Sequence, residues 1–254
     1  MIVPMNALTS RQTQILKALI DEYIETAEPV GSDALEKKYN LGVSPATIRN
    51  EMSNLTKSGF LKQPHTSAGR VPTSGAMKFY VDQLMEEKQM SLADEVKAKE
   101  EVWDDRGNFN KFVNEMTHSL ADRTGGMAIT MTDDGSVWQA GHANIFSYPE
   151  FGDIRACASL FDFMDEDEQL IDLFFNRFPI ETPFDVLFTE DLGFRNMPVG
   201  IVAAHFKVKD KHSLAGETGK NGALGVIGPV RQSYSSLVPT IRYYRGMLEE
   251  IMGI

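Results

Sequence analysis

The chain has 254 residues, which suggests one large domain or two ordinary ones, and its hydrophobic content of 42% is sufficient for packed cores. No apolar run approaches the roughly 20 residues of a membrane-spanning helix. The N-terminus lacks the charged and apolar regions of a signal peptide, so we expect a cytoplasmic protein with no membrane partner. Cys157 is the only cysteine, which excludes an intrachain disulfide and a zinc site made of cysteine pairs.

The net charge of −11 is unevenly distributed. Residues 1–90 contain ten Lys or Arg and ten Asp or Glu, whereas residues 91–254 contain 15 basic and 26 acidic residues. Within residues 40–81 five basic residues face a single acid, Glu51, which gives a local charge of +4. A basic patch on a neutral domain favours nucleic-acid binding, although an ordinary solvated surface is the alternative.

The chain begins with a predicted core helix. Thr9 and Gln12 have the spacing of a capping box, in which each side chain bonds the other residue's backbone N–H. Apolar residues then recur at helical intervals, which indicates a buried face. This stripe consists of Ile15, Leu16, Leu19, Ile20, Tyr23 and Ile24.

A second, shorter helix is expected after the break at 29–31, Pro-Val-Gly. We expect Ser32 to cap it and the helix to carry Leu35 and Tyr39. A turn containing Gly42 then leads into a third helix. Two helices joined by such a turn match the helix-turn-helix pattern, which is only moderately specific because many helical hairpins share it.

The third helix has clear start and stop signals. Ser44 is a good N-cap, Pro45 fits the first helical position, and Gly59 is a natural residue just beyond the end. At about 100° per residue, one narrow sector of this helix is apolar. Its members are Ile48, Met52 and Leu55.

The opposite face of the third helix suits the major groove of DNA. Small residues permit close approach, the Asn50 amide can pair bidentately with an adenine edge, and cations can meet guanine or phosphate. We therefore expect this face, together with the start of the helix, to bind DNA. The residues are Ser44, Ala46, Thr47, Arg49, Asn50, Ser53 and Lys57.

A two-stranded ribbon should follow Gly59. Residues 60–63 and 70–71 read as its strands and 64–69 as a polar tip, as in the wing of a winged helix. An ordinary surface hairpin is the alternative, but phosphate-binding side chains are concentrated here. They are Lys62, His65, Thr66, Ser67 and Arg70.

The next segments should close the first domain and connect it to a second. A helical stripe contains Met77, Tyr80, Val81, Leu84 and Met85. Residues 86–105 are highly charged and compatible with a helical connector. We place the domains at 1–87 and 105–254, with a linker at 88–104.

The second domain should mix helices and strands. A helix is expected from about Asn110 to Arg123, with Phe112, Val113, Met116 and Leu120 on one face and Gly125-Gly126 as its stop. Residues 127–132 and 137–140 should form a hairpin around the turn at 133–135, and a further helix should span 151–163. Further strands are predicted at 186–189, 199–207 and 223–227.

Two features of this region have competing explanations. An acidic run includes Asp162, Asp165, Glu166, Asp167, Glu168 and Asp172; we favour a solvated helix junction over a metal or basic-partner site, because oxygen-ligand loops need turn residues between their carboxylates. A final helix has apolar residues spaced 4-3-4-3, for which we favour packing on a sheet over a short coiled coil. These are Leu237, Ile241, Tyr244, Leu248 and Ile251.

The N-terminal motifs together resemble one family, the heat-inducible transcription repressor HrcA. The resemblance covers about residues 8–85 and rests on SPATIRNEM at 44–52, QPHTSAGRVPT at 63–73 and YVDQLM at 80–85. PEFGDI at 149–154 and GALGVIGPVRQSY at 222–234 resemble the end of the same family's GAF-like domain.

The resemblance implies an α+β fold, with an N-terminal winged helix-turn-helix domain followed by a shortened GAF-like α/β domain. It also implies a repressor of chaperone genes that binds an inverted-repeat operator called CIRCE. A GroEL-type chaperonin is implied as a further partner.

The chain departs from the family in one large way. Only about a dozen residues separate LADRTGGMAIT at 120–130 from HANIF at 142–146, where relatives have part of the GAF-like sheet and an inserted dimerisation domain. We expect a homodimer nonetheless, because an inverted repeat has two symmetric half-sites and each needs one DNA-binding domain. Its proposed interface lies in 105–254 and includes the last helix and Phe174, Phe175, Phe178, Phe184 and Phe188.

No catalytic constellation is present in the sequence, so we expect no enzyme activity, no cofactor and no metal. Residues 216–221, Gly-Glu-Thr-Gly-Lys-Asn, only partly match a phosphate loop, because Leu214 and Asn221 replace required residues, and a hairpin tip is the better explanation. His142, His205 and His212 lack metalloprotease spacing. A small-molecule-responsive regulator that senses a ligand through its GAF-like domain is the alternative function.

Overall fold

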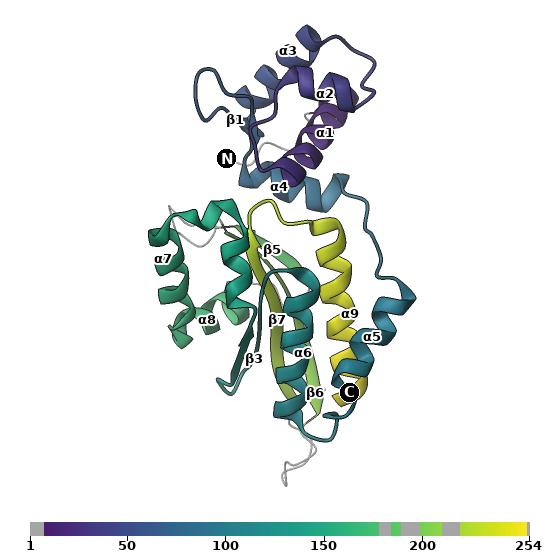
Figure 1. Cartoon of the computed structure of the whole chain (residues 1–254), viewed down its shortest axis with the longest axis vertical. Helices are drawn as coiled ribbons and strands as arrows, with labels where there is room; N and C mark the ends of the chain where they lie inside the picture. Colours follow the sequence, from purple (N-terminus) through teal and green to yellow (C-terminus); the bar gives the residue numbers. More distant parts are fainter. Residues whose placement is uncertain (1–7, 178–183, 189–198, 210–218, 253–254) are drawn as a thin grey trace. The chain divides into compact units, whose positions relative to one another are not determined.

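The computed structural model describes residues 8–177, 184–188, 199–209 and 219–252. The chain divides into two compact units, with the division between Glu86 and Glu87 (Figure 1). The segment predicted as a linker contains helix α5 (Leu92–Trp103), which belongs to the second unit and buries Ala98 and Val102 there.

In the first unit, helix α1 spans Ser10–Thr26 and α2 spans Ser32–Lys38. The predicted capping box of Thr9 and Gln12 is confirmed, and Ile15, Leu16, Leu19 and Ile20 are buried. The prediction for Ser32 is wrong. Gly31 is the N-cap, because its extended backbone already turns the chain into the helix, and Ser32 is a buried residue of the first turn.

Helix α3 (Pro45–Lys57) lies where the capping signals predicted it, and its apolar residues Ile48, Met52 and Leu55 are buried. Strands β1 (Leu61–Lys62) and β2 (Val71–Pro72) form the short antiparallel ribbon of the wing. Helix α4 (Ser74–Phe79) and the π-helical turn η2 (Tyr80–Leu84) complete the first unit.

The second unit contains a five-stranded antiparallel sheet with the order β4-β3-β7-β6-β5. Strands β3 (Met127–Thr132) and β4 (Val137–Ala140) form the predicted hairpin. The other strands are β5 (Asp185–Phe188), β6 (Val199–Lys209) and β7 (Gly219–Pro229). The last two are longer than predicted, because each pairs with the other along its whole length. Strand β4 forms one edge of the sheet, and the short hairpin that joins it to β3 lies where the resemblance implies an insertion in relatives.

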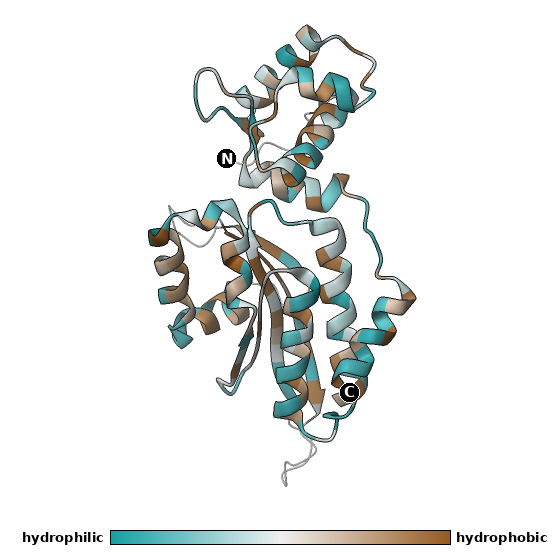
Figure 2. Ribbon diagram, viewed as in Figure 1, coloured by the Kyte–Doolittle hydropathy of each residue, from teal (hydrophilic) through white to brown (hydrophobic). Residues whose placement is uncertain are grey.

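Helices cover both faces of this sheet, and hydrophobic residues concentrate along its strands (Figure 2). Helix α6 (Phe109–Thr124) and helix α9 (Tyr234–Met252) pack on one face. The opposite face packs against a second group of elements, which share one apolar cluster with β3, β6 and β7. These are η3 (His142–Ser147), η4 (Pro149–Gly152), α7 (Ile154–Met164), α8 (Asp167–Ile171) and η5 (Asp172–Arg177).

The final helix packs on the sheet, as favoured from its spacing. Leu237, Ile241, Tyr244 and Leu248 of α9 are all buried. The acidic run lies at the junction of α7 and α8, where Asp165, Glu166, Asp167 and Glu168 are solvent exposed.

The expected aromatic dimer surface is largely internal. Phe174 and Phe188 are completely buried in the unit's own core, so neither is available to a partner chain. Phe175 packs against the same core cluster as Phe174, and Phe184 lies under the guanidinium of Arg242. Phe178 is outside the described residues. Phe174 and Phe175 thus pack against the unit's own sheet, whereas the sequence pattern predicted them at a dimer interface.

The phosphate-loop segment falls partly outside the described residues, which exclude 214 and 216–218. Its last residues, Gly219 to Asn221, lie in strand β7 and pair with β6. Lys220 Nζ is 2.7 Å from Asp134 Oδ2. The described part is therefore regular strand.

Candidate nucleic-acid interface

The start of α3 is fixed by its cap. Ser44 Oγ accepts a hydrogen bond from the backbone N–H of Thr47 at 3.3 Å and lies 3.1 Å from Thr47 Oγ1. Burial of Ile48 and Leu55 then determines the rotation of the helix about its axis. The polar side of α3 is consequently held at the surface of the first unit.

That surface carries the residues predicted to read DNA. Ala46, Arg49, Asn50 and Lys57 are exposed, while Thr47 and Ser53 are half-buried. Within the described chain, the side chains of Arg49, Asn50 and Lys57 make no hydrogen bond or ion pair. Because no internal partner must be displaced, these three groups are free to bind an external ligand.

The single acid of α3 is directed away from this face. Glu51 is half-buried, and its Oε2 accepts hydrogen bonds from Gln12 Nε2 at 3.0 Å and Asn54 Nδ2 at 3.4 Å. The bond to Gln12 joins α3 to α1. Glu51 therefore contributes to packing between helices, and the exposed part of α3 carries cations without an acid among them.

The tip of the wing is organised by a residue that the sequence did not single out. Gln63 Nε2 donates to the carbonyls of Thr66 at 2.9 Å and Ala68 at 3.0 Å. The backbone N–H of Ala68 also bonds the carbonyl of His65 at 2.9 Å. His65, Thr66 and Ser67 are exposed on this loop, and Lys62 is exposed at the end of β1.

The base of the wing crosses the segment that precedes α2. Arg70 and Val30 exchange backbone hydrogen bonds of 2.8 and 2.9 Å. A Cβ atom on Gly69 would collide with the Val30 carbonyl, so only glycine fits this crossing without movement. The wing is thereby attached to the helical part of the first unit.

Arg70 differs from the other predicted DNA-binding cations because it has an internal partner. Its side chain is half-buried, and Nε donates to Thr56 Oγ1 at 3.1 Å. Thr56 lies in the last turn of α3. The structure thus groups Arg49, Asn50, Lys57 and Lys62 as exposed side chains and sets Arg70 apart from them.

The end of the first unit is also tied to α1. The Tyr80 hydroxyl donates to Asp21 Oδ1 at 2.6 Å, and burial together with this bond raises the pKa of Tyr80 above its ordinary value. Thr73 Oγ1 bonds the Gly59 carbonyl at 2.8 Å. These contacts attach η2 to α1 and the start of α4 to the turn after α3.

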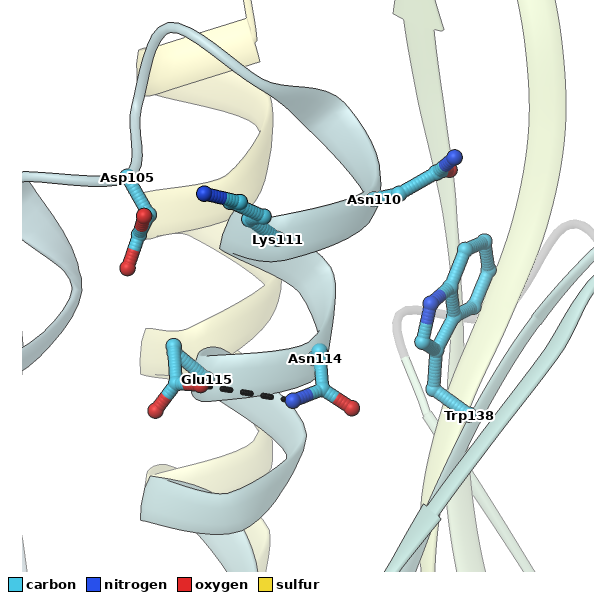
Figure 3. A pocket seen from close by; sticks show the side chains of 6 residues that line it. All are labelled: Asp105, Asn110, Lys111, Asn114, Glu115 and Trp138. Carbon is cyan, nitrogen blue, oxygen red and sulfur yellow. Dashed lines mark hydrogen bonds between the residues drawn. The ribbon is translucent and has the colours of Figure 1, made fainter.

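The second unit has a shallow hollow of about 450 Å³ beside α6 and β4 (Figure 3). Its lining residues are Asp105, Asn110, Lys111, Asn114, Glu115 and Trp138. Among the described residues, no buried side-chain polar atom lacks a hydrogen-bond partner, so no buried group in the hollow awaits a ligand. The hollow therefore gives no support to the ligand-sensing alternative.

Among the described residues, every helix is too short or too polar to span a membrane. No group of three or more His, Cys, Asp or Glu in the same ranges is placed to hold a metal ion.

Family models match most of the chain. Residues 7–86 match the winged helix-turn-helix transcription repressor, HrcA DNA-binding model, and residues 77–238 match the HrcA protein C-terminal domain model. The second match alone covers more than half of the chain.

Individual relatives agree with these models. The chain is 50% identical over 125 residues to the heat-inducible transcription repressor HrcA of Desulforamulus reducens, which is 49% of this chain and 34% of that protein. It is 56% identical over 88 residues to the protein of the same name from Clostridium perfringens, which is 35% of this chain and 26% of that protein. The matched stretches thus span about a third or less of the relatives' length.

A solved structure supports the fold alone. A hypothetical protein solved at 2.2 Å resolution is similar with a TM-score of 0.72 and 17% identity, over 96% of this chain and 98% of that chain. With the winged helix in the first unit, the antiparallel sheet in the second and both family models matched in order, the chain belongs to the HrcA family.

Proposed function

We propose that this protein is a sequence-specific DNA-binding repressor of chaperone genes, in which α3 enters the major groove. One observation carries the proposal. Arg49, Asn50 and Lys57 form an exposed face without internal partners, in a segment that matches a DNA-binding family model. The relatives are named heat-inducible transcription repressors, which supports a role in repressing transcription in response to temperature.

The residues divide into base-reading and phosphate-binding groups. Asn50 would pair with an adenine edge, Arg49 with guanine or phosphate, and the small side chains of Ala46 and Ser53 would permit close approach. The remaining residues lie at the start of α3, at its end and on the wing, where contacts to the DNA backbone are expected. They are Ser44, Thr47, Lys57, Lys62, His65, Thr66 and Ser67.

We propose an inverted-repeat operator of the CIRCE type and a homodimer that reads it. A single module buries only about 600–1,000 Å² on DNA, which is usually too little for tight specific binding at physiological salt. Because the core of the first unit uses its apolar stripes internally, the second unit is the proposed site of pairing. Phe174 and Phe188 are not part of it, since both are buried.

The cellular setting is part of the same proposal. A cytoplasmic location fits a repressor, and a GroEL-type chaperonin is proposed as a folding partner on the strength of the family resemblance. Refolding of the denatured chain with and without chaperonin and ATP tests that partner. A recovery of DNA-binding protein that chaperonin leaves unchanged would argue against it.

The function is tested by selecting duplexes from a random library with the full-length chain, followed by footprinting upstream of chaperone operons from its genome of origin. We expect an enriched inverted repeat that is also protected upstream of those operons. Sedimentation of the chain with and without the selected duplex tests the dimer. Enrichment of no sequence, or a single half-site bound by one chain, would contradict the proposal.

A further inference from the structure

Arg70 faces the protein, unlike the exposed cations around it. Its Nε atom donates to Thr56 Oγ1 at 3.1 Å, and its Nη1 atom is 3.5 Å from the Gly69 carbonyl. Lys57 and Lys62 are exposed, whereas Arg70 is half-buried. Its guanidinium therefore connects the base of the wing with the end of α3.

The acceptor on α3 is held in place by a second bond. Thr56 Oγ1 donates its proton to the Met52 carbonyl at 2.8 Å, which leaves its lone pairs to accept from Arg70. Thr56 is in the last turn of α3, where the helix dipole favours a nearby cation. One hydroxyl thus joins the helix backbone to the wing.

The backbone of Arg70 is fixed as well. It exchanges hydrogen bonds of 2.8 and 2.9 Å with Val30, and Gly69 beside it is packed against the Val30 carbonyl. The wing is consequently anchored to the segment before α2 through its backbone. The side-chain bond between Arg70 and Thr56 is the additional link that sets the wing against α3.

We propose that Arg70 is a positioning residue for DNA binding, which acts through Thr56 to hold the wing at the angle where wing and α3 reach the same duplex. The inference rests on the proposed function and deepens it. A wing already held in its binding position loses less conformational freedom on association, so the link increases affinity without touching DNA.

The test compares four variants with the wild-type chain on a duplex that the wild-type chain selects from a random library. Thr56→Val removes the hydroxyl and keeps the shape, Thr56→Ser keeps the hydroxyl, and Arg70→Ala removes the guanidinium. We expect Thr56→Val to weaken binding about tenfold, because the released wing must then be ordered on association, a cost limited by the strength of the lost charge-assisted hydrogen bond. Thr56→Ser should bind as the wild type does, and Thr56→Val/Arg70→Ala no more weakly than Arg70→Ala alone.

Binding is measured below the melting temperature of every variant, so that a purely structural role would leave affinity unchanged. If Arg70→Ala does not fold, the Thr56→Val and Thr56→Ser pair decides the question alone. Wild-type affinity in Thr56→Val, or losses that add in the double variant, would overturn the inference while the proposed function stands. A wild-type chain that selects no duplex overturns the proposed function itself, and the inference with it.

Discussion

The two units use their charged side chains differently. In the second unit, three cations form ion pairs that connect separate segments: Arg242 with Glu87, Lys99 with Glu250, and Arg123 with Asp94 and Glu101. On α3 of the first unit, Arg49 and Lys57 have no described partner. In the acidic second unit, these ion pairs connect segments of the fold. In the first unit, the cations of α3 are exposed at one surface without an ion pair to any described residue.

The interior of the second unit shows how far this internal use extends. The Tyr244 hydroxyl lies 2.6 Å from Ser119 Oγ and accepts from Arg123 Nε at 3.0 Å. Burial raises the pKa of Tyr244 above its ordinary value. This network joins α6 to α9 and, through Glu101, to α5. In the second unit these charged groups connect helices, whereas the exposed charges of α3 are the ones proposed to bind DNA.

The largest effect should come from the wing crossing in the first unit. Gly69→Ala places a Cβ against the Val30 carbonyl, and we expect a loss of roughly 2–4 kcal/mol in unfolding free energy, with loss of DNA binding. Urea unfolding followed by circular dichroism measures it. Gly75→Ala is the matched control, because the nearest atom to its Cβ is Thr73 Oγ1 at 3.8 Å. Equal stability of both variants would contradict the assigned role of Gly69.

The next effect concerns base reading. Asn50→Ala should weaken binding to the selected duplex by roughly 1–3 kcal/mol and leave random-sequence binding nearly unchanged. Fluorescence anisotropy on both duplexes measures the difference, with Asn40→Ala on the turn before α3 as the control. The same loss on both duplexes would remove Asn50 from base recognition.

A charge pair of the second unit should affect stability instead of binding. Arg242 lowers the pKa of Glu87, so this pair adds stability above the ordinary glutamate pKa of 4.5, and that stability disappears as the pH falls through the lowered value. Glu87→Gln should cost up to about 1 kcal/mol at neutral pH and nothing in acid. Unfolding titrations at both pH values check this, and a cost that persists in acid would refute it.

The smallest effect concerns phosphate contacts of the wing. Lys62→Gln should reduce the slope of log affinity against log salt by about 0.9, the value for one phosphate contact. Lys111→Gln, an exposed cation of the second unit, is the control and should leave the slope unchanged. If both substitutions change the slope equally, the division of roles between the units is wrong.

Local signals made much of the fold predictable from the sequence. The Thr9 capping box, the Ser44 cap and the hairpin of β3 and β4 depend on residues close together in the chain, so their patterns were sufficient. The prediction of Ser32 as the N-cap of α2 is wrong because Gly31 takes that position. Both glycine and serine are common N-cap residues, so the sequence does not decide between these neighbours. The extra length of β7 was missed because its start, rich in glycine, is a strand only through pairing with β6.

The site was predictable where it depends on helical periodicity. The exposed side of α3 followed from the spacing of Ile48, Met52 and Leu55. The bond between Arg70 and Thr56 was not predictable, because the two residues are 14 positions apart and meet only when the wing folds against α3. The burial of Phe174 was not predictable either, because it depends on tertiary packing between segments distant in the chain. The sequence pattern therefore placed Phe174 at an interface instead of in the core.

The central claim, that the outer face of α3 lies in the major groove, can be tested with a DNA-cleaving label. Cys157 is buried at 4% exposure, so an iron chelate can be attached selectively to Ala46→Cys on α3 or to Ala34→Cys on α2, where the side chains are exposed. We predict that the label at position 46 cuts the selected duplex inside both half-sites, with the offset between strands typical of the major groove, and that the label at position 34 cuts more weakly. Equal cleavage from the two positions, or none from position 46, would contradict the claim.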